Sequence, residues 1–530
     1  MAHTIPAAVQ AAARQFGDAA AIAEPGGLVH SYRELHDGVR RVAGALMANG
    51  IERGDRIAVW SPNTRHWVFA ALGSLYAGAT LVPVNTRFTG REALEVITRS
   101  RVSALFVADQ FLGVDRLALL VAAASAEHDG GGAAGHLPGL VVRIPVAAHD
   151  PPLANDGSPS LARSWTEFIA STADLPAAAP DERAGAVEPD DVSDILFTSG
   201  TTGRSKGAMS AHRQALGVAR AWTSCAGLTQ ADRYLIVNPF FHSFGYKAGI
   251  LACLITGATI VPQRIFDAGE VLRLIEAERI TVLPGAPTIY VSLLDHPDRA
   301  SRDLSSLRLA VTGAAVVPVA LVERMRAELG FDTVLTAYGL TEAVVATMCR
   351  PGDDPRTVAT TSGRGTAGFE VRVSAEGEIL LRGPNVMLGY LDDPAATAEA
   401  IDGEGWLHTG DVGRLDERGY LTITDRLKDM YICGGFNVYP AEVEQVLARH
   451  LAVAESAVIG VPDGRLGEVG KAFVVTRPGQ QATADELIGF CRERLANYKV
   501  PRQVEFRTEL PRNPAGKPLK RVLRQEGRNQ

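Results

Sequence analysis

Hydrophobic positions in the first hundred residues alternate between helical and strand-like spacing. Apolar residues recur every three or four positions over residues 35–46, and Gly50 follows where a helix should end. A buried strand is expected over residues 57–60, and a second helical pattern covers residues 67–76. This alternation predicts α/β layers with largely parallel strands.

A second α/β block is expected over residues 194–340. Its candidate strands are 195–197, 234–237, 259–261, 281–283 and 309–311, and helical patterns separate most of them. Two stretches, 122–136 and 151–191, are rich in Ala, Gly, Pro and Asp, so we expect surface insertions there without chemistry.

The pattern changes again over residues 370–424, where short strands alternate with tight Gly and Asp turns, as in a small sheet or barrel. A charged stretch follows, and then a tail with helix–strand alternation. The prediction is an α/β protein with a large N-terminal domain, residues 1–425, and a small α+β C-terminal domain, residues 426–530. The large domain would contain two α/β layered subdomains and a small β-barrel-like subdomain.

Composition narrows the class of protein. A chain of 530 residues exceeds what one hydrophobic core usually supports, so at least two domains are expected. No apolar run approaches the roughly 20 residues that cross a bilayer, and the N-terminus does not resemble a secretion signal. Five cysteines without a C-x-x-C pair indicate reduced thiols in a cytoplasmic protein, with neither structural zinc nor disulfides. A net charge of −7 argues against a nucleic-acid coat protein but leaves room for a local phosphate site.

One loop has the composition of a phosphate cradle. An apolar strand ends at Thr198, and glycines, hydroxyl residues and two cations follow. Glycines let the backbone approach an anion closely, and consecutive N–H groups and hydroxyls can surround it. The loop lacks the G-K-[ST] ending of a Walker A motif. Its residues are Thr198, Ser199, Gly200, Thr201, Thr202, Gly203, Arg204, Ser205, Lys206 and Gly207.

This loop and four further motifs occur in an order that resembles the adenylate-forming enzymes, the family of acyl-CoA synthetases, luciferases and peptide-synthetase adenylation domains. The resemblance covers nearly the whole chain. The other motifs are Tyr338-Gly339-Leu340-Thr341-Glu342, Trp406-Leu407-His408-Thr409-Gly410-Asp411, Asp425-Arg426-Leu427-Lys428-Asp429 and Pro511-Arg512-Asn513-Pro514-Ala515-Gly516-Lys517.

The resemblance implies ATP, Mg²⁺ and coenzyme A as cofactors, with Lys517, Thr341 and Glu342 as the catalytic residues. Glu342, with Thr198, would hold the metal ion, because a hard cation requires oxygen ligands. Thr341 would donate to the α-phosphate, and Lys517 would bridge that phosphate and the substrate carboxylate.

The nucleotide would also contact several other residues. Asp411 would accept the ribose hydroxyls, and Arg426 would contact the ribose or phosphate. Gly313, Ala314 and Ala315 resemble the adenine-side segment, although packing at a strand end explains such small residues equally well. The remaining predicted ATP- or AMP-binding residues are Ser199, Gly200, Thr201, Thr202, Gly203, Lys206, Tyr338 and Gly339.

Two further sites follow from the resemblance. The acyl pocket would be formed by Phe240, Phe241, His242, Gly245 and Thr288, with His242 as an orienting residue, because a carboxylate is already ionised at pH 7 and needs no base. The C-terminal domain would be mobile and rotate about Lys428 between two half-reactions. The pantetheine of coenzyme A would then pass Cys433, Gly434, Gly435 and Phe436, where Cys433 is interpreted as structural.

The reaction predicted is ATP-dependent ligation of a carboxylic acid to coenzyme A. Three stretches, 197–207, 238–257 and 362–410, are similar to actinobacterial steroid-degradation ligases that act on the 7a-methyl-1,5-dioxo-octahydroindenyl propanoate left from the steroid C and D rings. The alternatives are a medium- or long-chain fatty acyl or aryl-acid ligase, and a non-catalytic nucleotide- or acyl-binding relative. The expected partners are the acid, ATP and coenzyme A, without nucleic acid, and a homo-oligomer is left open.

Overall fold

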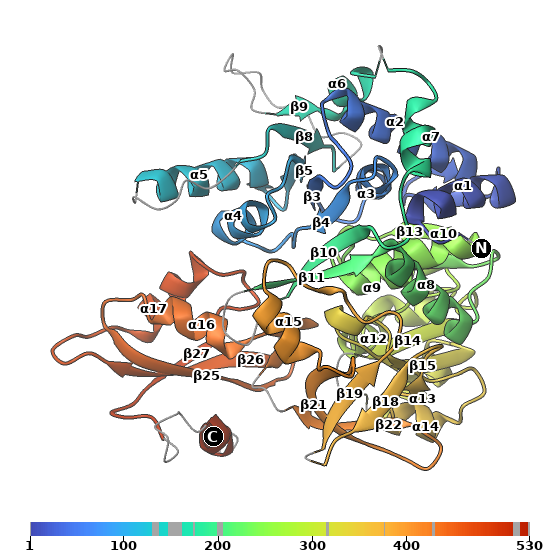
Figure 1. Cartoon of the computed structure of the whole chain (residues 1–530). Helices are drawn as coiled ribbons and strands as arrows, with labels where there is room; N and C mark the ends of the chain where they lie inside the picture. Colours follow the sequence, from blue (N-terminus) through green and yellow to red (C-terminus); the bar gives the residue numbers. More distant parts are fainter. Residues whose placement is uncertain are drawn as a thin grey trace.

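The computed structural model describes residues 2–129, 137–146, 162–172, 175–198, 205–313, 317, 319–375, 377–426, 430–511 and 520–527. Figure 1 shows two layered α/β parts, one mainly blue and teal and one mainly green and yellow, with an orange β sheet and the red C-terminal part beside them. Among the described residues, no helix has the length and apolarity to cross a bilayer.

The first sheet carries the strand that leads into the phosphate loop. Its strands lie in the order β20 (Gly389–Tyr390), β11 (Lys206–Ala211), β10 (Val192–Thr198), β4 (Thr80–Pro83), β3 (Arg56–Trp60), β5 (Ala104–Ala108), β8 (Leu140–Ile144) and β9 (Arg163–Ser164). Pairing is parallel from β10 to β9, whereas β10–β11 and β11–β20 are antiparallel.

Helices cover both faces of this sheet because successive side chains of a strand point to opposite sides. Ile57 and Val59 of β3 belong to the core that includes α2 (Tyr32–Ala48) and α3 (Arg65–Tyr76). Ala58 and Trp60 belong to a second cluster with α4 (Gly90–Arg99) and α5 (Arg116–Asp129). The expected helix over 35–46, strand over 57–60 and helix over 67–76 are thus confirmed.

The second sheet has the order β2 (Val29–Ser31), β1 (Ala20–Ala23), β13 (Thr259–Pro262), β12 (Arg233–Ile236), then β14 (Leu309–Gly313), β15 (Thr333–Tyr338), β16 (Thr347–Met348) and β17 (Arg364–Gly365). Val282 joins the two halves through single bridges to Tyr234 and Leu309. The strand predicted over 281–283 is thus reduced to bridges at Val282. The Leu283 and Gly285 N–H groups still donate to β14 at 3.0 Å, but Pro284 between them has no N–H to donate towards β12. Its helices include α1 (Ile5–Phe16), α8 (His212–Ala226), α11 (Ala268–Ala277), α12 (Pro287–Leu294) and α13 (Val319–Glu328).

The two predicted insertions contain regular structure. Residues 122–129 are the last turns of α5, and residues 163–185 include β9, α6 (Trp165–Ala170) and α7 (Ala179–Gly185). A capping box between Ser164 and Glu167 begins α6, and Phe168 is fully buried in the main core. Asp181 of α7 accepts hydrogen bonds from Arg40 and Tyr76 at 2.9 and 2.6 Å. These segments therefore complete the first layer, and the expectation of plain surface insertions was wrong for their described parts.

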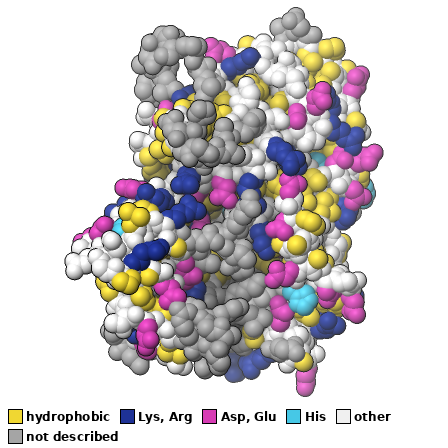
Figure 2. Space-filling view, turned by 60° about the vertical axis from the view of Figure 1, so that its left-hand side comes forward, with side chains coloured by type: hydrophobic (Ala, Val, Ile, Leu, Met, Phe, Trp, Pro, Cys, Tyr) yellow, Lys and Arg dark blue, Asp and Glu magenta, His cyan; other side chains and the backbone are white. Residues whose placement is uncertain are grey.

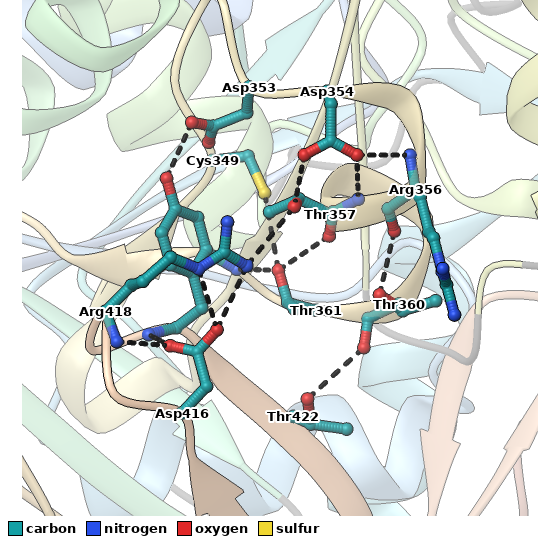
Figure 3. A network of polar contacts seen from close by, with 12 residues as sticks. Cys349, Asp353, Asp354, Arg356, Thr357, Thr360, Thr361, Asp416, Arg418 and Thr422 are labelled. Atoms are coloured by element: carbon teal, nitrogen blue, oxygen red, sulfur yellow. Dashed lines mark hydrogen bonds and ion pairs between the residues drawn. The ribbon is translucent and has the colours of Figure 1, made fainter.

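The small β subdomain is an antiparallel sheet in the order β18 (Glu370–Val373), β19 (Glu378–Arg382), β21 (Leu407–Leu415) and β22 (Leu421–Arg426). Figure 3 shows the polar network that ties its β21–β22 turn to α14 (Pro355–Thr360). Arg418 donates to Asp416 at 3.0 Å and to Thr357 at 3.3 Å, and the Thr357 hydroxyl donates to Asp354, the N-cap of α14, at 2.5 Å.

The C-terminal part has a hydrophobic cluster of its own. Its sheet has the order β24 (Phe436–Val438), β23 (Tyr431–Cys433), β26 (Gly467–Thr476) and β25 (Val453–Asp463), with β27 (Gln503–Phe506) beside β26. Its helices are α16 (Pro440–Leu447), α17 (Ala484–Arg492) and α18 (Lys520–Gly527).

A buried lysine joins the C-terminal part to the first layer. Lys499 Nζ lies 2.8 Å from Glu92 Oε1 of α4 and 2.6 Å from Glu442 Oε1 of α16. Burial opposes the charge on Lys499, but the two carboxylates outweigh this effect and raise its pKa well above the usual value. Beside it, the Asn85 amide lies 3.0 Å from the Tyr498 hydroxyl. The two parts therefore meet through polar contacts that burial strengthens.

A second buried ion pair lies within the large domain. Lys247 Nζ is 2.8 Å from Asp194 Oδ1 and donates to Ser210 Oγ at 2.8 Å. The Ser193 hydroxyl donates to the other Asp194 oxygen at 2.7 Å. Lys247 belongs to a π-helical segment, Tyr246–Leu251, that follows the predicted acyl-pocket residues. The pair thus connects that segment to β10 and β11.

Replacing Lys247 by Met should lower the free energy of unfolding by about 3–5 kcal/mol, because it leaves the fully buried Asp194 without its countercharge. Urea unfolding followed by tryptophan fluorescence measures the loss. Arg273→Met is the matched control, since Arg273 pairs with Glu270 at 2.7 Å on the surface and such pairs contribute about 0–1 kcal/mol. The double variant Lys247→Met/Asp194→Leu should regain much of the lost stability. Equal losses in Lys247→Met and in the surface control would contradict the assignment.

Candidate active site

The described ends of the predicted phosphate loop belong to a hairpin of β10 and β11. Strands β10 and β11 pair in antiparallel register up to Thr198 and Lys206, and the Thr198 hydroxyl donates to the Lys206 carbonyl at 3.4 Å. A Cβ at Gly207 would lie 2.8 Å from Ile195 and 3.1 Å from Phe197, so the hairpin needs glycine there. The predicted loop residues Ser199, Gly200, Thr201, Thr202 and Gly203 lie outside the described residues.

A polar pocket of about 320 Å³ opens at the loop end of this hairpin. Arg99 reaches into it from α4 and donates to the Ser205 carbonyl and, at 3.3 Å, to the Ser205 hydroxyl. Its guanidinium also lies 5.5 Å from the centre of the Phe197 ring. The residue before Lys206 is therefore held in place by α4. The pocket is lined by Thr98, Arg99, Arg101, Ser205, Lys206, Leu391, Asp392 and Asp393.

Glu342 reaches the same region from the second sheet. It lies in a 3-10 turn, Thr341–Ala343, two residues after the end of β15. A Cβ at Gly339 would lie 1.9 Å from the Val344 carbonyl oxygen, so glycine lets the chain fold back on itself here. The turn presents Thr341 and Glu342 at the carboxyl edge of the sheet, where ligands of α/β proteins commonly bind.

Tyr390 connects Glu342 to Lys206, and the sequence analysis missed it. Its hydroxyl donates to Glu342 Oε1 at 2.7 Å, and Lys206 Nζ lies 4.9 Å from the centre of its ring. Burial and the neighbouring Glu342 carboxylate raise the pKa of the Tyr390 phenol, which keeps it a hydrogen-bond donor. A strand of two residues is too short to give a periodic signal, so only the structure reveals this contact.

Two of the residues predicted to bind the nucleoside meet where the end of β15 lies beside the middle of β21. The Tyr338 hydroxyl donates to Asp411 Oδ2 at 2.6 Å. Asp411 is the backbone register partner of Arg426, which ends β22. Gly313 ends β14 beside β15, and a Cβ there would lie 2.3 Å from the Ala337 carbonyl oxygen. Strand packing thus accounts for glycine at this position, and the adjoining Ala314 and Ala315 lie outside the described residues.

The residues predicted to form the acyl wall differ in how deeply they are buried. Phe240 is fully buried and packs on Trp67 at 5.2 Å between ring centres, so it lies behind the wall, whereas Phe241 is half-buried. Val344 is half-buried too, but its neighbours Ala343, Val345 and Ala346 belong to the core.

His242 begins a short helix, Ser243–Gly245, and its Nδ1 accepts the Phe244 N–H at 3.2 Å. Its side chain is exposed to solvent, yet nearby protein atoms desolvate it and lower its pKa to about 4. The ring is therefore neutral at pH 7, as an orienting residue requires. A Cβ at Gly245 would lie 2.3 Å from the Pro239 carbonyl oxygen, so glycine allows this tight turn.

The other side of the acyl wall lies next to the predicted thiol path. The Asn238 amide donates to the Pro284 carbonyl at 3.0 Å, which joins the His242 segment to the loop before α12, and half-buried Thr288 lies in the first turn of that helix. In the C-terminal part, Gly434 and Gly435 form the turn between β23 and β24 with φ of 57° and 83°. A Cβ at Gly435 would lie 3.7 Å from that of Ala286, two residues before Thr288.

The other predicted thiol-path residues flank this turn. Phe436 stacks on Tyr498 at 4.7 Å between ring centres, and Arg87 lies 4.4 Å from the centre of the Phe436 ring. Cys433 is buried, and desolvation raises the pKa of its thiol, which fits the structural role given to it. The structure thus places Gly435 of the C-terminal part near Ala286, two residues before Thr288.

Not every predicted residue can be placed. Lys517, the predicted catalytic lysine, and Lys428, the predicted hinge, lie outside the described residues. Within the described part of the chain, no group of three or more His, Cys, Asp and Glu residues could hold a metal ion. Figure 2 shows basic and acidic side chains intermingled over one face of the molecule, an arrangement that does not attract polyanions in general.

Comparison with known proteins places this site in a family. The profile of the family described as AMP-binding enzyme matches residues 9–391, and that of its C-terminal domain matches residues 442–517. A 3-[(3aS,4S,7aS)-7a-methyl-1,5-dioxo-octahydro-1H-inden-4-yl]propanoyl:CoA ligase from Rhodococcus jostii (strain RHA1) is 60% identical over 523 residues, 99% of this chain and 98% of the relative. The protein with the same name from Mycobacterium tuberculosis (strain ATCC 25618 / H37Rv) is 58% identical over 530 residues, 99% of each chain.

A solved structure agrees with these matches. An o-succinylbenzoate CoA synthetase double mutant from Bacillus subtilis, bound to a product analogue, is similar to this chain with a TM-score of 0.78 and 27% identity, over 99% of this chain and 98% of that one. Two family profiles and relatives of this identity and coverage leave no doubt about the family. The chain belongs to the AMP-binding enzymes.

Proposed function

We propose that this chain is an AMP-forming acid:CoA ligase. In the first step a carboxylate oxygen attacks the α-phosphorus of ATP, which forms an acyl-adenylate and releases pyrophosphate. In the second step the thiolate of coenzyme A attacks the acyl carbon, which forms a thioester and releases AMP. The observation that carries the proposal is 58–60% identity, over nearly the whole chain, to two proteins named as propanoyl:CoA ligases.

The geometry supports the first step. The loop after Thr198 and the Lys206 ammonium would hold the phosphates, and Asp411, fixed by Tyr338, would accept the ribose hydroxyls. Thr341, beside Glu342, would donate to the α-phosphate. The contacts of these groups suit a nucleotide that lies between the ends of β10 and β15 and the middle of β21.

The oxygen atoms of Glu342 and Thr198 are suitable ligands for Mg²⁺. This ion needs only one or two carboxylates, because it keeps water molecules and binds phosphate oxygens. Glu342 would hold it, assisted by the Thr198 hydroxyl. When bound, the ion would neutralise phosphate charge. His242, neutral above its pKa of about 4, would orient the acid without taking its proton.

The contact between Gly435 and Ala286 supports the second step. Glycines with positive φ let a slender thiol arm pass close to the backbone. The arm would run past Cys433, Gly434, Gly435 and Phe436 towards the acyl wall at Phe241, His242 and Thr288. Because this path uses both parts of the chain, we also propose a domain boundary at residues 425–426 and a hinge at Lys428.

For the acid we propose the bicyclic propanoate named for the two relatives, as an intermediate of steroid breakdown. A fatty acyl or aryl acid is the alternative within the same chemistry. A non-catalytic binding protein is disfavoured, because Lys206, Glu342, Asp411, Arg426 and Lys517 are all present. Cytoplasmic location and a homo-oligomer stay predictions.

Pyrophosphate release tests the function directly. In a coupled assay with ATP, Mg²⁺, coenzyme A and acids of graded size, the bicyclic propanoate should give the highest kcat/KM, with fatty and aryl acids lower. Glu342→Gln serves as the inactive control. A preference for a fatty or aryl acid would overturn the substrate, and release with none of the acids would favour the binding protein.

Lys517→Ala should reduce adenylation by about 100-fold or more, because it removes the charge expected to stabilise the transition state. Thioester formation from a supplied acyl-adenylate should be spared. Single-turnover measurements of each half-reaction separate the two effects. Lys520→Ala is the matched control, since Lys520 pairs with Glu444 at 2.7 Å. Equal loss of both half-reactions in Lys517→Ala would contradict the assigned role.

Lys428→Pro should slow thioester formation by about tenfold or more and affect adenylation less, because proline fixes φ at the proposed hinge. The same two single-turnover assays measure this. Lys428→Ala removes the side chain but not the backbone freedom, so it should leave both steps near the wild-type rates. Unchanged thioester formation in Lys428→Pro would place the hinge elsewhere.

A further inference from the structure

We propose that Tyr390 is a positioning residue for adenylation. Its hydroxyl aims the Glu342 carboxylate, while its ring supports the Lys206 ammonium. One side chain therefore holds a site anion and a site cation in place and keeps them apart. The inference rests on the proposed function, in which Glu342 holds the metal ion and Lys206 holds the phosphates.

The backbone of Tyr390 is fixed from two sides. It lies in β20, which pairs with β11, where the register partner of Tyr390 is Ala208. The Leu391 N–H donates to the Gly207 carbonyl at 2.8 Å, so this edge is bonded directly beside Lys206. On the other side, the Tyr390 N–H donates to Thr397 Oγ1 of α15 (Pro394–Ala400) at 2.8 Å. The phenol therefore starts from a well-determined position.

The backbone of Glu342 is attached to the same segment. Its carbonyl accepts the Met387 N–H at 2.8 Å, three residues before Tyr390. The segment from Met387 to Leu391 thus bonds the turn of Glu342 at one end and the strand of Lys206 at the other. Tyr390 is the side chain within it that contacts both charged groups.

The two contacts use different properties of the phenol. The hydroxyl donates to the carboxylate, whereas the negative face of the ring attracts the ammonium. Glu342 and Lys206 are half-buried and of opposite charge, and among the described residues no ion pair joins them. Direct pairing would neutralise both groups. The bond from Tyr390 uses Oε1 and leaves Oε2 of Glu342 for a hard cation.

Hydrogen bonds to a metal-binding carboxylate commonly change metal affinity by about 10- to 100-fold. Tyr390→Phe keeps the ring and loses the hydroxyl. It should raise the Mg²⁺ concentration for half-maximal ATP binding by about tenfold, with ATP binding in EDTA unchanged. Tyr390→Leu also loses the ring, so it should weaken ATP binding in EDTA as well. Isothermal titration calorimetry of ATP at graded Mg²⁺ measures both.

A double-mutant cycle shows whether Tyr390 acts through Glu342. In a Glu342→Gln background, Tyr390→Phe should cause no further change in the Mg²⁺ requirement. Tyr420→Phe is the matched control, because Tyr420 donates to Asp353 at 2.6 Å in the polar network of the β subdomain, and its Mg²⁺ requirement should equal that of wild type.

An unchanged Mg²⁺ requirement in Tyr390→Phe would overturn the proposal, and so would an equal shift in the wild-type and Glu342→Gln backgrounds. The calorimetry contains no acid and no coenzyme A. Failure of wild type to release pyrophosphate with any acid would therefore contradict the proposed function separately.

Discussion

The buried ion pair between Lys247 and Asp194 is the constraint on which the candidate site depends. It joins the strand that leads into the phosphate loop to the π-helical segment behind the acyl wall. A buried charge tolerates little displacement from its partner, so a shift of β10 relative to the π-helical segment costs free energy. The β20 segment adds a second restraint from the edge of the sheet. The position of β10 relative to the π-helical segment is therefore set by the core rather than by the loops.

Sequence patterns predicted what is local and periodic. The helix over 35–46 and the strand over 57–60 follow from spacing alone, and the structure has both. The motifs named Tyr338 and Asp411, which a hydrogen bond joins in the structure. The helices in the Pro- and Ala-rich stretch were missed because its composition is typical of a loop. A helix signal was nevertheless present in the sequence, since Ser164 and Glu167 form a capping box. Lys247 also had a signal, because a lysine inside the apolar run 246–254 requires a buried partner.

Contacts between distant segments could not be predicted in this way. Tyr390 reaches Glu342 and Lys206 only because β20 adds to a sheet whose other strands come from much earlier in the chain. The bridges at Val282 likewise depend on strands to either side of it. Periodicity reports which face of a segment is buried, but it does not report which partner buries it. Residues whose role depends on contacts between distant segments can therefore be identified only from a structure.

The mixed order of strands has a consequence for synthesis on the ribosome. β1 finds its neighbour β13 only after residue 262 has emerged, and β11 gains its outer neighbour only at residues 389–390. Until then their unpaired edges are exposed, and contacts of such high sequence separation form slowly. Most of the large domain must therefore be translated before either sheet has all of its strands. Its nascent chain should rely on holding chaperones longer than a protein with sheets built in sequence order.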